Sequence, residues 1–218
     1  MSETGTERDG DPDGNERERT GKGSGGEPTP AEKVATLRSD PVLASAIDEH
    51  GVLELEPAAD PFARIVTSIV NQQLSVASAA AIRERLFSSV EVTPEGILAA
   101  DETELRECGL STQKIAYTRN VAEAFANEEL SIPDLETESD EAIIEALTEI
   151  GGIGDWTAKM VLMFVFGRED VFPVEDLGVR KAIEQGYGEH TRAEMRDLST
   201  RWEPYRSLAS LYLWRTVD

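Results

Sequence analysis

A glycine-rich run and an aspartate about twenty residues later are the residues in this chain that point most clearly to chemistry. Residues 147–158 read Leu-Thr-Glu-Ile-Gly-Gly-Ile-Gly-Asp-Trp-Thr-Ala, which is typical of a helix, a glycine hairpin and a second helix. Glycine tolerates positive φ and close backbone approach. The first-turn amides of the second helix lack intrahelical partners and form an anion site, for which a DNA phosphate is the natural ligand. Asp176 is expected to face the same groove and to do acid–base or electrostatic chemistry there.

Helical periodicity covers almost the whole chain from Thr29 onward, and no convincing pair of strands appears. Cap residues and prolines predict where the helices begin. The expected helices start at Thr29-Pro30, cover 40–50, start near Pro61, cover 76–87, start at Thr93-Pro94, and cover 101–109, 111–126, 139 or 140 to the hairpin, 155–166, 176–185, 191–202 and 204–216. The fold class is therefore all-α with a helix-hairpin-helix motif. We further expect two helical subdomains flanking a DNA-binding cleft, as part of the hypothesis of a DNA-binding protein.

The expected domain organisation has three parts. Residues 1–28 hold seven glycines and almost no large apolar side chain, so we expect a disordered acidic tail. Residues 29–60 and 176–218 would join into a terminal helical subdomain. Residues 61–175 would form a central subdomain that contains the hairpin, with Asp176 at the junction of the two.

The net charge of −22 is the strongest compositional argument against a DNA-binding protein, because an acidic surface repels DNA. Residues 177–218 are the exception, because this segment has six acidic and seven basic side chains and is not net negative. One explanation is that the protein binds no nucleic acid. The other, which we favour, is a halophilic host: in molar salt the Debye length falls to about 3 Å, so diffuse repulsion is screened.

The cysteine and histidine content limits the cofactors. Cys108 is the only cysteine, which excludes an intrachain disulfide and a cysteine-ligated iron–sulfur cluster. Two histidines, His50 and His190, leave few ligands for metal catalysis. No apolar run approaches the length of a membrane span, and no signal-peptide core is present. We therefore expect a cytoplasmic protein that has no membrane partner.

Four segments of the chain resemble the helix-hairpin-helix (HhH-GPD) superfamily of base-excision DNA glycosylases, over roughly residues 40–216. The closer similarity is to the DNA-3-methyladenine glycosylase II branch. The segments are Ile150–Gly154, similar to the family hairpin; Pro173–Val179, similar to the segment with the active-site aspartate; Ile69–Ser75, similar to the DNA-probing loop; and Arg201–Ser207 with Ala209 and Tyr212–Trp214, similar to the C-terminal motif. Larger members of the branch carry an N-terminal β domain, so this chain looks like the short all-helical form.

The resemblance implies that Asp176 is the catalytic residue. Cleavage of an N-glycosidic bond builds oxocarbenium character on the sugar, and a nearby carboxylate stabilises that charge and orients water. Asp176 also suits the N-cap of the helix that follows, and the two roles are compatible. Glu175 is the rival carboxylate, expected to point elsewhere.

The resemblance also implies a base pocket made by Trp156, Met160 and Trp214. Bifunctional relatives have a lysine where this chain has Trp156, so a monofunctional enzyme without lyase activity is predicted, and Lys159 should not substitute. An electron-rich ring such as that of Trp214 attracts the positive charge of alkylated purines. Trp156 suits core packing equally well, and the Met160 position is aromatic in some relatives, which leaves the substrate range open.

Tyr212 and Trp202 are the two other aromatic residues that share this C-terminal stretch with Trp214. Tyr212 and Trp214 stand two residues apart on one helix and must face different sides, so at least one of them is core or surface. Trp202 is expected in the core because of its size and apolar character.

DNA contacts are expected from the probing loop, the hairpin and the helix after Asp176. Gln72, Gln73 and Leu74 would wedge into the base stack, the last two being the better candidates; a polar turn between helices is the alternative. The remaining predicted contacts are the Gly152 and Gly154 amides, with Arg180 and Lys181 either touching phosphate or simply solvated; Lys114 and Arg119 are expected at the surface. In relatives, hairpin carbonyls hold a structural K⁺ or Na⁺, which would fall at the Ile150 and Ile153 backbone.

The resulting hypothesis is a monomeric, monofunctional DNA glycosylase that flips alkylated purines such as 3-methyladenine out of double-stranded DNA. A second enzymatic hypothesis changes only the substrate, to deaminated or oxidised bases. A third is a non-catalytic helix-hairpin-helix module, and a fourth is an acidic helical scaffold with no affinity for DNA. Retention of function by Asp176→Asn would favour the third, and absence of DNA binding in high salt would favour the fourth.

Overall fold

The computed structural model describes residues 27–217, which are helical without any strand. The predicted tail therefore lies almost entirely outside the described residues. The helices are α1 (Pro30–Leu37), α2 (Pro41–His50), α3 (Pro61–Asn71), α4 (Val76–Ser89), α5 (Pro94–Ala99), α6 (Glu102–Glu107), α7 (Thr112–Ala126), α8 (Ile132–Leu135), α9 (Asp140–Thr148), α10 (Asp155–Phe164), α11 (Leu177–Tyr187), α12 (Arg192–Ser199), the 3₁₀ helix η1 (Thr200–Trp202) and α13 (Arg206–Arg215). None of these helices is long and apolar enough to cross a membrane.

Capping side chains explain where most of the helices begin. An oxygen in each cap accepts a hydrogen bond from a first-turn amide that has no intrahelical partner. The caps of this kind are Thr29, Asp40, Asp60, Ser75, Thr93, Ser111, Ser139, Asp176 and Thr191. Most of these starts were predicted from the sequence. The four-residue helix α8 was not predicted, and α10 ends at Phe164, two residues before the predicted end at Phe166.

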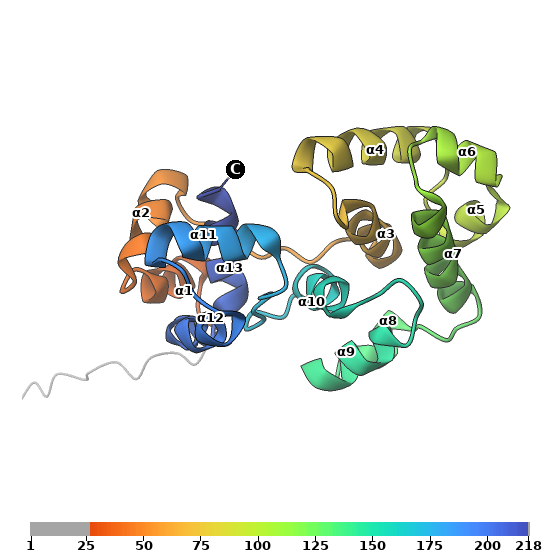
Figure 1. Cartoon of the computed structure of the whole chain (residues 1–218). Coiled ribbons are helices and arrows are strands. Elements are labelled where there is room, and N and C mark those ends of the chain that lie inside the picture. The colour runs from red at the N-terminus through yellow and green to blue at the C-terminus, as the bar shows by residue number, and fades with distance from the viewer. Residues whose placement is uncertain (1–26, 218) are drawn as a thin grey trace, which may run out of the picture.

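The buried side chains form two hydrophobic clusters, and the helices gather accordingly. In Figure 1, α1, α2, α11, α12 and α13 lie together on one side, α3 to α7 lie on the other, and α10 lies between them. The terminal cluster combines residues between Val34 and Ile47 with residues between Phe172 and Leu213. The central cluster runs from Phe62 to Val171. The chain thus crosses between the two helical groups twice, near 51–60 and near 165–176.

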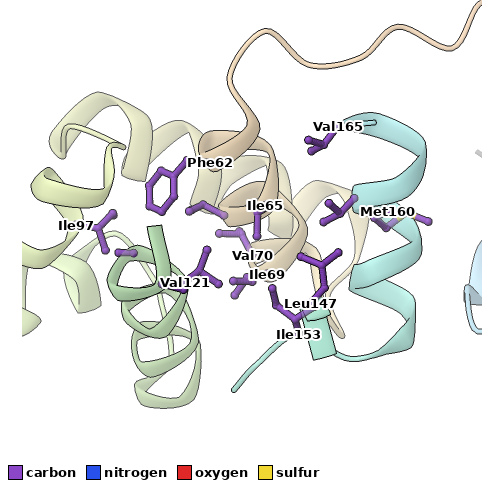
Figure 2. Close-up of a cluster of buried hydrophobic side chains, with 14 of the residues drawn as sticks. Phe62, Ile65, Ile69, Val70, Ile97, Val121, Leu147, Ile153, Met160 and Val165 are labelled. Atoms are coloured by element: carbon purple, nitrogen blue, oxygen red, sulfur yellow. The ribbon is translucent and has the colours of Figure 1, made fainter. Parts of the chain in front are cut away.

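The central cluster is built around α3, whose apolar stripe is almost entirely buried. Phe62, Ile65 and Ile69 lie on this helix and are at most 4% exposed. Figure 2 shows them facing Val121 of α7 and Ile153 of the hairpin, with α10 on the other side. Apolar residues at spacings of three and four place one face of a helix in the core. This packing fixes α3, and therefore the loop that follows it, against the hairpin.

Hydrogen bonds from α13 fix both crossings. The buried Tyr212 hydroxyl accepts from the Leu53 amide at 2.9 Å and donates to the Gly51 carbonyl at 2.8 Å. At the second crossing, Arg206 donates to Asp170 at 2.7 Å. Tyr212 is therefore the core member of the Tyr212 and Trp214 pair, as the spacing argument required of one of them.

Candidate functional site

Asp176 lies at the N-cap of α11 and accepts three hydrogen bonds. Its Oδ1 accepts from the Val179 amide at 2.9 Å and from the Trp214 indole Nε1 at 2.8 Å. Its Oδ2 accepts from the Trp156 indole Nε1 at 2.8 Å. All three partners are donors, which suits an ionised carboxylate because that group only accepts. The side chain is thus fixed in one orientation while it remains partly exposed.

Three helices from different parts of the chain deliver these groups. Trp156 comes from the first turn of α10, directly after the hairpin, and Trp214 comes from the last turn of α13. Trp214 packs against both hydrophobic clusters, so Asp176 lies where the two helical groups meet. A Cβ at Gly178 would lie 2.9 Å from the Trp214 ring and 3.1 Å from Asp176 Oδ1. The absence of a side chain at Gly178 is what lets the indole approach the carboxylate, a role that sequence reasoning missed.

Phe164 packs against the Trp214 ring and Arg64 lies over the Phe164 ring, and sequence reasoning missed both. The Phe164 and Trp214 rings stack with centroids 6.1 Å apart and planes at 25°. The Arg64 guanidinium lies 4.3 Å from the centroid of the Phe164 ring. Burial is the main cause that lowers the pKa of Arg64, with a smaller contribution from Arg83. The eight-residue spacing between Trp156 and Phe164 on α10, two steps of four, was the available signal, since it places both on one face of the helix.

Met160 does not join the other two predicted pocket residues. It shares the helix face with Trp156, but it is 4% exposed and belongs to the central cluster (Figure 2). The physical reason is that α10 lies between the two helical groups, so the middle of this face is covered. Trp202 is 1% exposed, as expected of a core residue.

Glu175 points away from Asp176 and is engaged by cations. Lys159 Nζ lies 2.7 Å from one Glu175 oxygen, and Arg196 lies 3.6 Å from the other. Lys159 is therefore paired with Glu175 rather than directed at Asp176.

The hairpin between α9 and α10 has the backbone that its glycines predict. Gly152 adopts φ 109°, and a Cβ there would overlap the Tyr117 ring of α7. Ile153 is buried in the central cluster, while Gly154 is exposed and caps α10 through its backbone alone. The α10 first turn thus presents its amides without a competing cap side chain. The Ile150 carbonyl accepts the Ile153 amide at 3.0 Å.

The loop between α3 and α4 separates the three predicted wedge residues. The Gln72 amide nitrogen donates to the Gly152 carbonyl at 3.0 Å and to the Thr157 hydroxyl at 2.9 Å. Gln72 therefore holds the loop against the hairpin and α10, and its side-chain amide is engaged within the protein. Gln73, at φ 56°, and Leu74, 39% exposed, form the projecting tip.

Four basic side chains were assigned from the sequence, and two of them are more buried than expected. Lys114 and Arg119 were expected at the surface, but both are half-buried and bind backbone carbonyls. The prediction was wrong because both side chains reach carbonyls at helix ends, which the sequence alone does not bring near them. Lys181 is exposed. Arg180 is half-buried, with an Nε that has no partner within residues 27–217.

Comparison with known proteins places this chain in a family. Residues 66–204 match the family described as HhH-GPD superfamily base excision DNA repair protein. DNA-3-methyladenine glycosylase 1 of Schizosaccharomyces pombe is 34% identical over 166 residues, which is 72% of this chain and 72% of that protein. YfjP of Bacillus subtilis is 32% identical over 81% of this chain, and the match spans 66% of its own length.

A solved structure agrees with these sequence matches. The 3-methyladenine DNA glycosylase Mag1 of S. pombe, in complex with abasic DNA, is 30% identical with a TM-score of 0.76. The match covers 84% of this chain and 95% of that one.

Proposed function

Because the chain belongs to the HhH-GPD superfamily of base excision DNA repair proteins, we propose that it is a DNA glycosylase that removes alkylated purines such as 3-methyladenine. The observation that carries this proposal is the Asp176 carboxylate, fixed by two indole N–H groups beside the first turn of α10. Relatives named DNA-3-methyladenine glycosylase support the substrate class.

Asp176 would act on the sugar of the flipped nucleotide. As the N-glycosidic bond breaks, positive charge develops on the sugar, and a fixed carboxylate stabilises it without reorganising. Oδ1 accepts two hydrogen bonds, but Oδ2 accepts only one. The remaining acceptor position on Oδ2 would orient the attacking water or face the sugar.

The neighbouring aromatic residues would form one wall for the base. Trp214 and Phe164 stack, and alkylated purines carry a positive charge that an aromatic face attracts. Lyase chemistry needs a lysine amine that attacks the sugar. Trp156 occupies the corresponding position here, and Lys159 is paired with Glu175, so we propose a monofunctional glycosylase.

The hairpin would bind DNA phosphate through the α10 first-turn amides. The Ile150 and Ile153 carbonyls have the oxygen chemistry that a K⁺ or Na⁺ requires, since a carbonyl that accepts one hydrogen bond keeps a second lone pair. A cation held there would add positive charge next to the phosphate. The hairpin lies in the subdomain predicted for residues 61–175, and the protein would act as a monomer across the cleft between the two subdomains.

A Gly152→Ala variant is expected to bind duplex DNA about tenfold more weakly, because a strained backbone costs about 1–3 kcal/mol and would shift the hairpin away from Tyr117. Gly188→Ala is the control, since Gly188 also has a positive φ, of 89°, but lies after α11, outside the hairpin, where a Cβ meets no atom within 4 Å. Fluorescence anisotropy with a labelled duplex measures both affinities. Equal affinities for the two variants would contradict the proposed role of the Gly152 turn.

The acidity of the chain bears on the conditions in which it would work. A hollow beside the hairpin is lined by Glu123, Glu128, Glu129, Asp134 and Glu149, among other residues. At low ionic strength these carboxylates would repel DNA, whereas in molar salt they are screened. We therefore propose that the protein functions in molar salt, as a halophilic protein would.

The experiment that tests the function uses duplexes with a single 7-methylguanine, hypoxanthine or 8-oxoguanine, at 0.1 M and 2 M KCl. We expect base loss from the 7-methylguanine duplex, seen as strand cleavage only after alkali, and more of it at 2 M KCl. Excision of hypoxanthine or 8-oxoguanine alone would favour the deaminated-base or oxidised-base alternative. Cleavage without alkali would contradict the absence of lyase activity, and DNA binding with no base loss would indicate a non-catalytic module.

A further inference from the structure

Lys114 reaches from the first turn of α7 to the C-terminal end of α3. Its Nζ donates to the Val70 carbonyl at 2.6 Å and to the Gln72 carbonyl at 2.9 Å. Burial lowers the pKa of this ammonium group. A side chain that is partly desolvated to bind two backbone carbonyls is a structural tie rather than a solvated charge.

The position of this tie gives it a specific consequence. The last carbonyls of a helix lack intrahelical partners and carry partial negative charge, so a cation there both satisfies and stabilises them. The two carbonyls that Lys114 binds belong to the residues immediately before the loop tip. The ammonium group therefore fixes the point at which the backbone leaves α3 and turns to positive φ at Gln73.

Two further ties hold the base of the loop, while the tip is left free. Arg83 of α4 donates to the Asn71 side chain at 2.6 Å, and Gln72 donates to the hairpin and to α10. Neither Gln73 nor Leu74 makes a side-chain hydrogen bond within residues 27–217. The result is a firmly held base that carries a partly exposed apolar tip.

We propose that Lys114 is a positioning residue for base flipping: it fixes the 70–72 segment so that the Leu74 tip can enter the base stack. This inference rests on the proposed function and deepens it. A wedge must displace stacked nucleobases. If the 70–72 segment that carries the tip can move, less of the binding energy goes into unstacking them. Loss of the Lys114 tie should therefore matter most where the target base is stacked and paired.

Arg119 supplies a matched control on the same helix. It also donates from α7 to a backbone carbonyl at the end of a helix, here Ala100 after α5, at 2.9 Å. That carbonyl is outside the loop. Lys114→Met and Arg119→Met each remove one cation and its hydrogen bonds to backbone carbonyls. They differ in the segment that loses its contact, which is 70–72 for Lys114 and Ala100 for Arg119.

The test compares excision of 7-methylguanine from two duplexes, one with cytosine opposite the lesion and one with an abasic analogue opposite it. An unpaired base costs less to flip. We expect Lys114→Met to lose about tenfold on the paired duplex, the effect of losing hydrogen bonds to a charged group, and less than about twofold on the unpaired one. Arg119→Met should change both by the same factor. Equal losses for Lys114→Met on both duplexes would overturn the positioning role, as would no loss on either.

A readout that does not depend on excision separates this inference from the proposed function. With 2-aminopurine next to the lesion, wedge insertion raises fluorescence when the protein binds. A rise with wild type that Lys114→Met lacks supports the inference even if no base is excised, whereas no rise with wild type overturns it. If Lys114→Met does not fold, Lys114→Gln, which keeps one donor, should give an intermediate rise; a rise equal to that of wild type would overturn the inference.

Discussion

The Asp176→Asn variant is expected to lose about 10²–10³-fold in the rate of base excision while it still binds duplex DNA. The amide is neutral and cannot offset the positive charge that develops on the sugar. It also presents an NH₂ group where the carboxylate presents an oxygen, so it cannot accept from both Trp156 and Trp214. If Asp176 faces DNA as proposed, removal of its negative charge should leave the affinity for duplex DNA at the wild-type level or above it.

Glu175→Gln is the control for this variant because it neutralises the adjacent carboxylate. Glu175 pairs with Lys159 and Arg196 rather than with the indoles, so we expect excision to change by less than about threefold, in line with the modest effect of a partly exposed ion pair. Single-turnover excision and anisotropy on the same duplex separate chemistry from binding. An excision rate of Asp176→Asn above a tenth of the wild-type rate would contradict a catalytic role for Asp176.

The helices and the positions of Asp176, Trp156 and Trp214 could be predicted from the sequence, because local signals specify them. A cap residue at a helix start, such as Asp176, can be recognised from the few residues that follow it in the sequence. The contact of Asp176 with two indoles from α10 and α13 was not predicted, since it depends on how helices far apart in sequence pack together.

Side chains that act over long distances in sequence explain most of the errors. Lys114 and Arg119 look like surface cations because their carbonyl partners belong to other helices. Met160 was expected in a pocket because it shares a helix face with Trp156. The sequence did not show that this part of the face is buried in the core. Gln72 was expected at the wedge, yet its partners lie on the hairpin, 80 residues later, and on α10, 85 residues later.

Asp40 organises the helical group that carries Asp176, although it is far from the site in sequence. Its carboxylate is 4% exposed and accepts from Tyr187 at 2.6 Å, from Trp202 at 3.1 Å and from two first-turn amides of α2. Arg201 lies 3.6 Å away. Burial alone would raise the pKa of Asp40, but the hydrogen bonds from Tyr187, Trp202 and the α2 amides outweigh it and hold the pKa below its usual 3.8.

We expect Asp40→Ala to lower the free energy of unfolding by about 3–5 kcal/mol, because it leaves the buried Trp202 donor and the half-buried Tyr187 donor without a partner and removes a helix cap. Asp48→Ala, which removes an exposed partner of Arg38, should cost less than about 1 kcal/mol. Urea titrations at constant KCl measure both, and equal losses would contradict the role of Asp40.

The pH dependence of stability follows from the same carboxylate. A depressed folded-state pKa stabilises the protein above pH 3.8 and loses that effect as pH falls through the folded value. Wild type should therefore lose more stability than Asp40→Ala as the pH drops below about 4, and the two urea midpoints should converge. Trp214 and Asp176 belong to this helical group. In Asp40→Ala, the excision rate should therefore fall at the urea concentrations that unfold the protein and not at lower ones. A difference between the midpoints that stays constant into acid would mean that Asp40 acts through packing rather than through its charge.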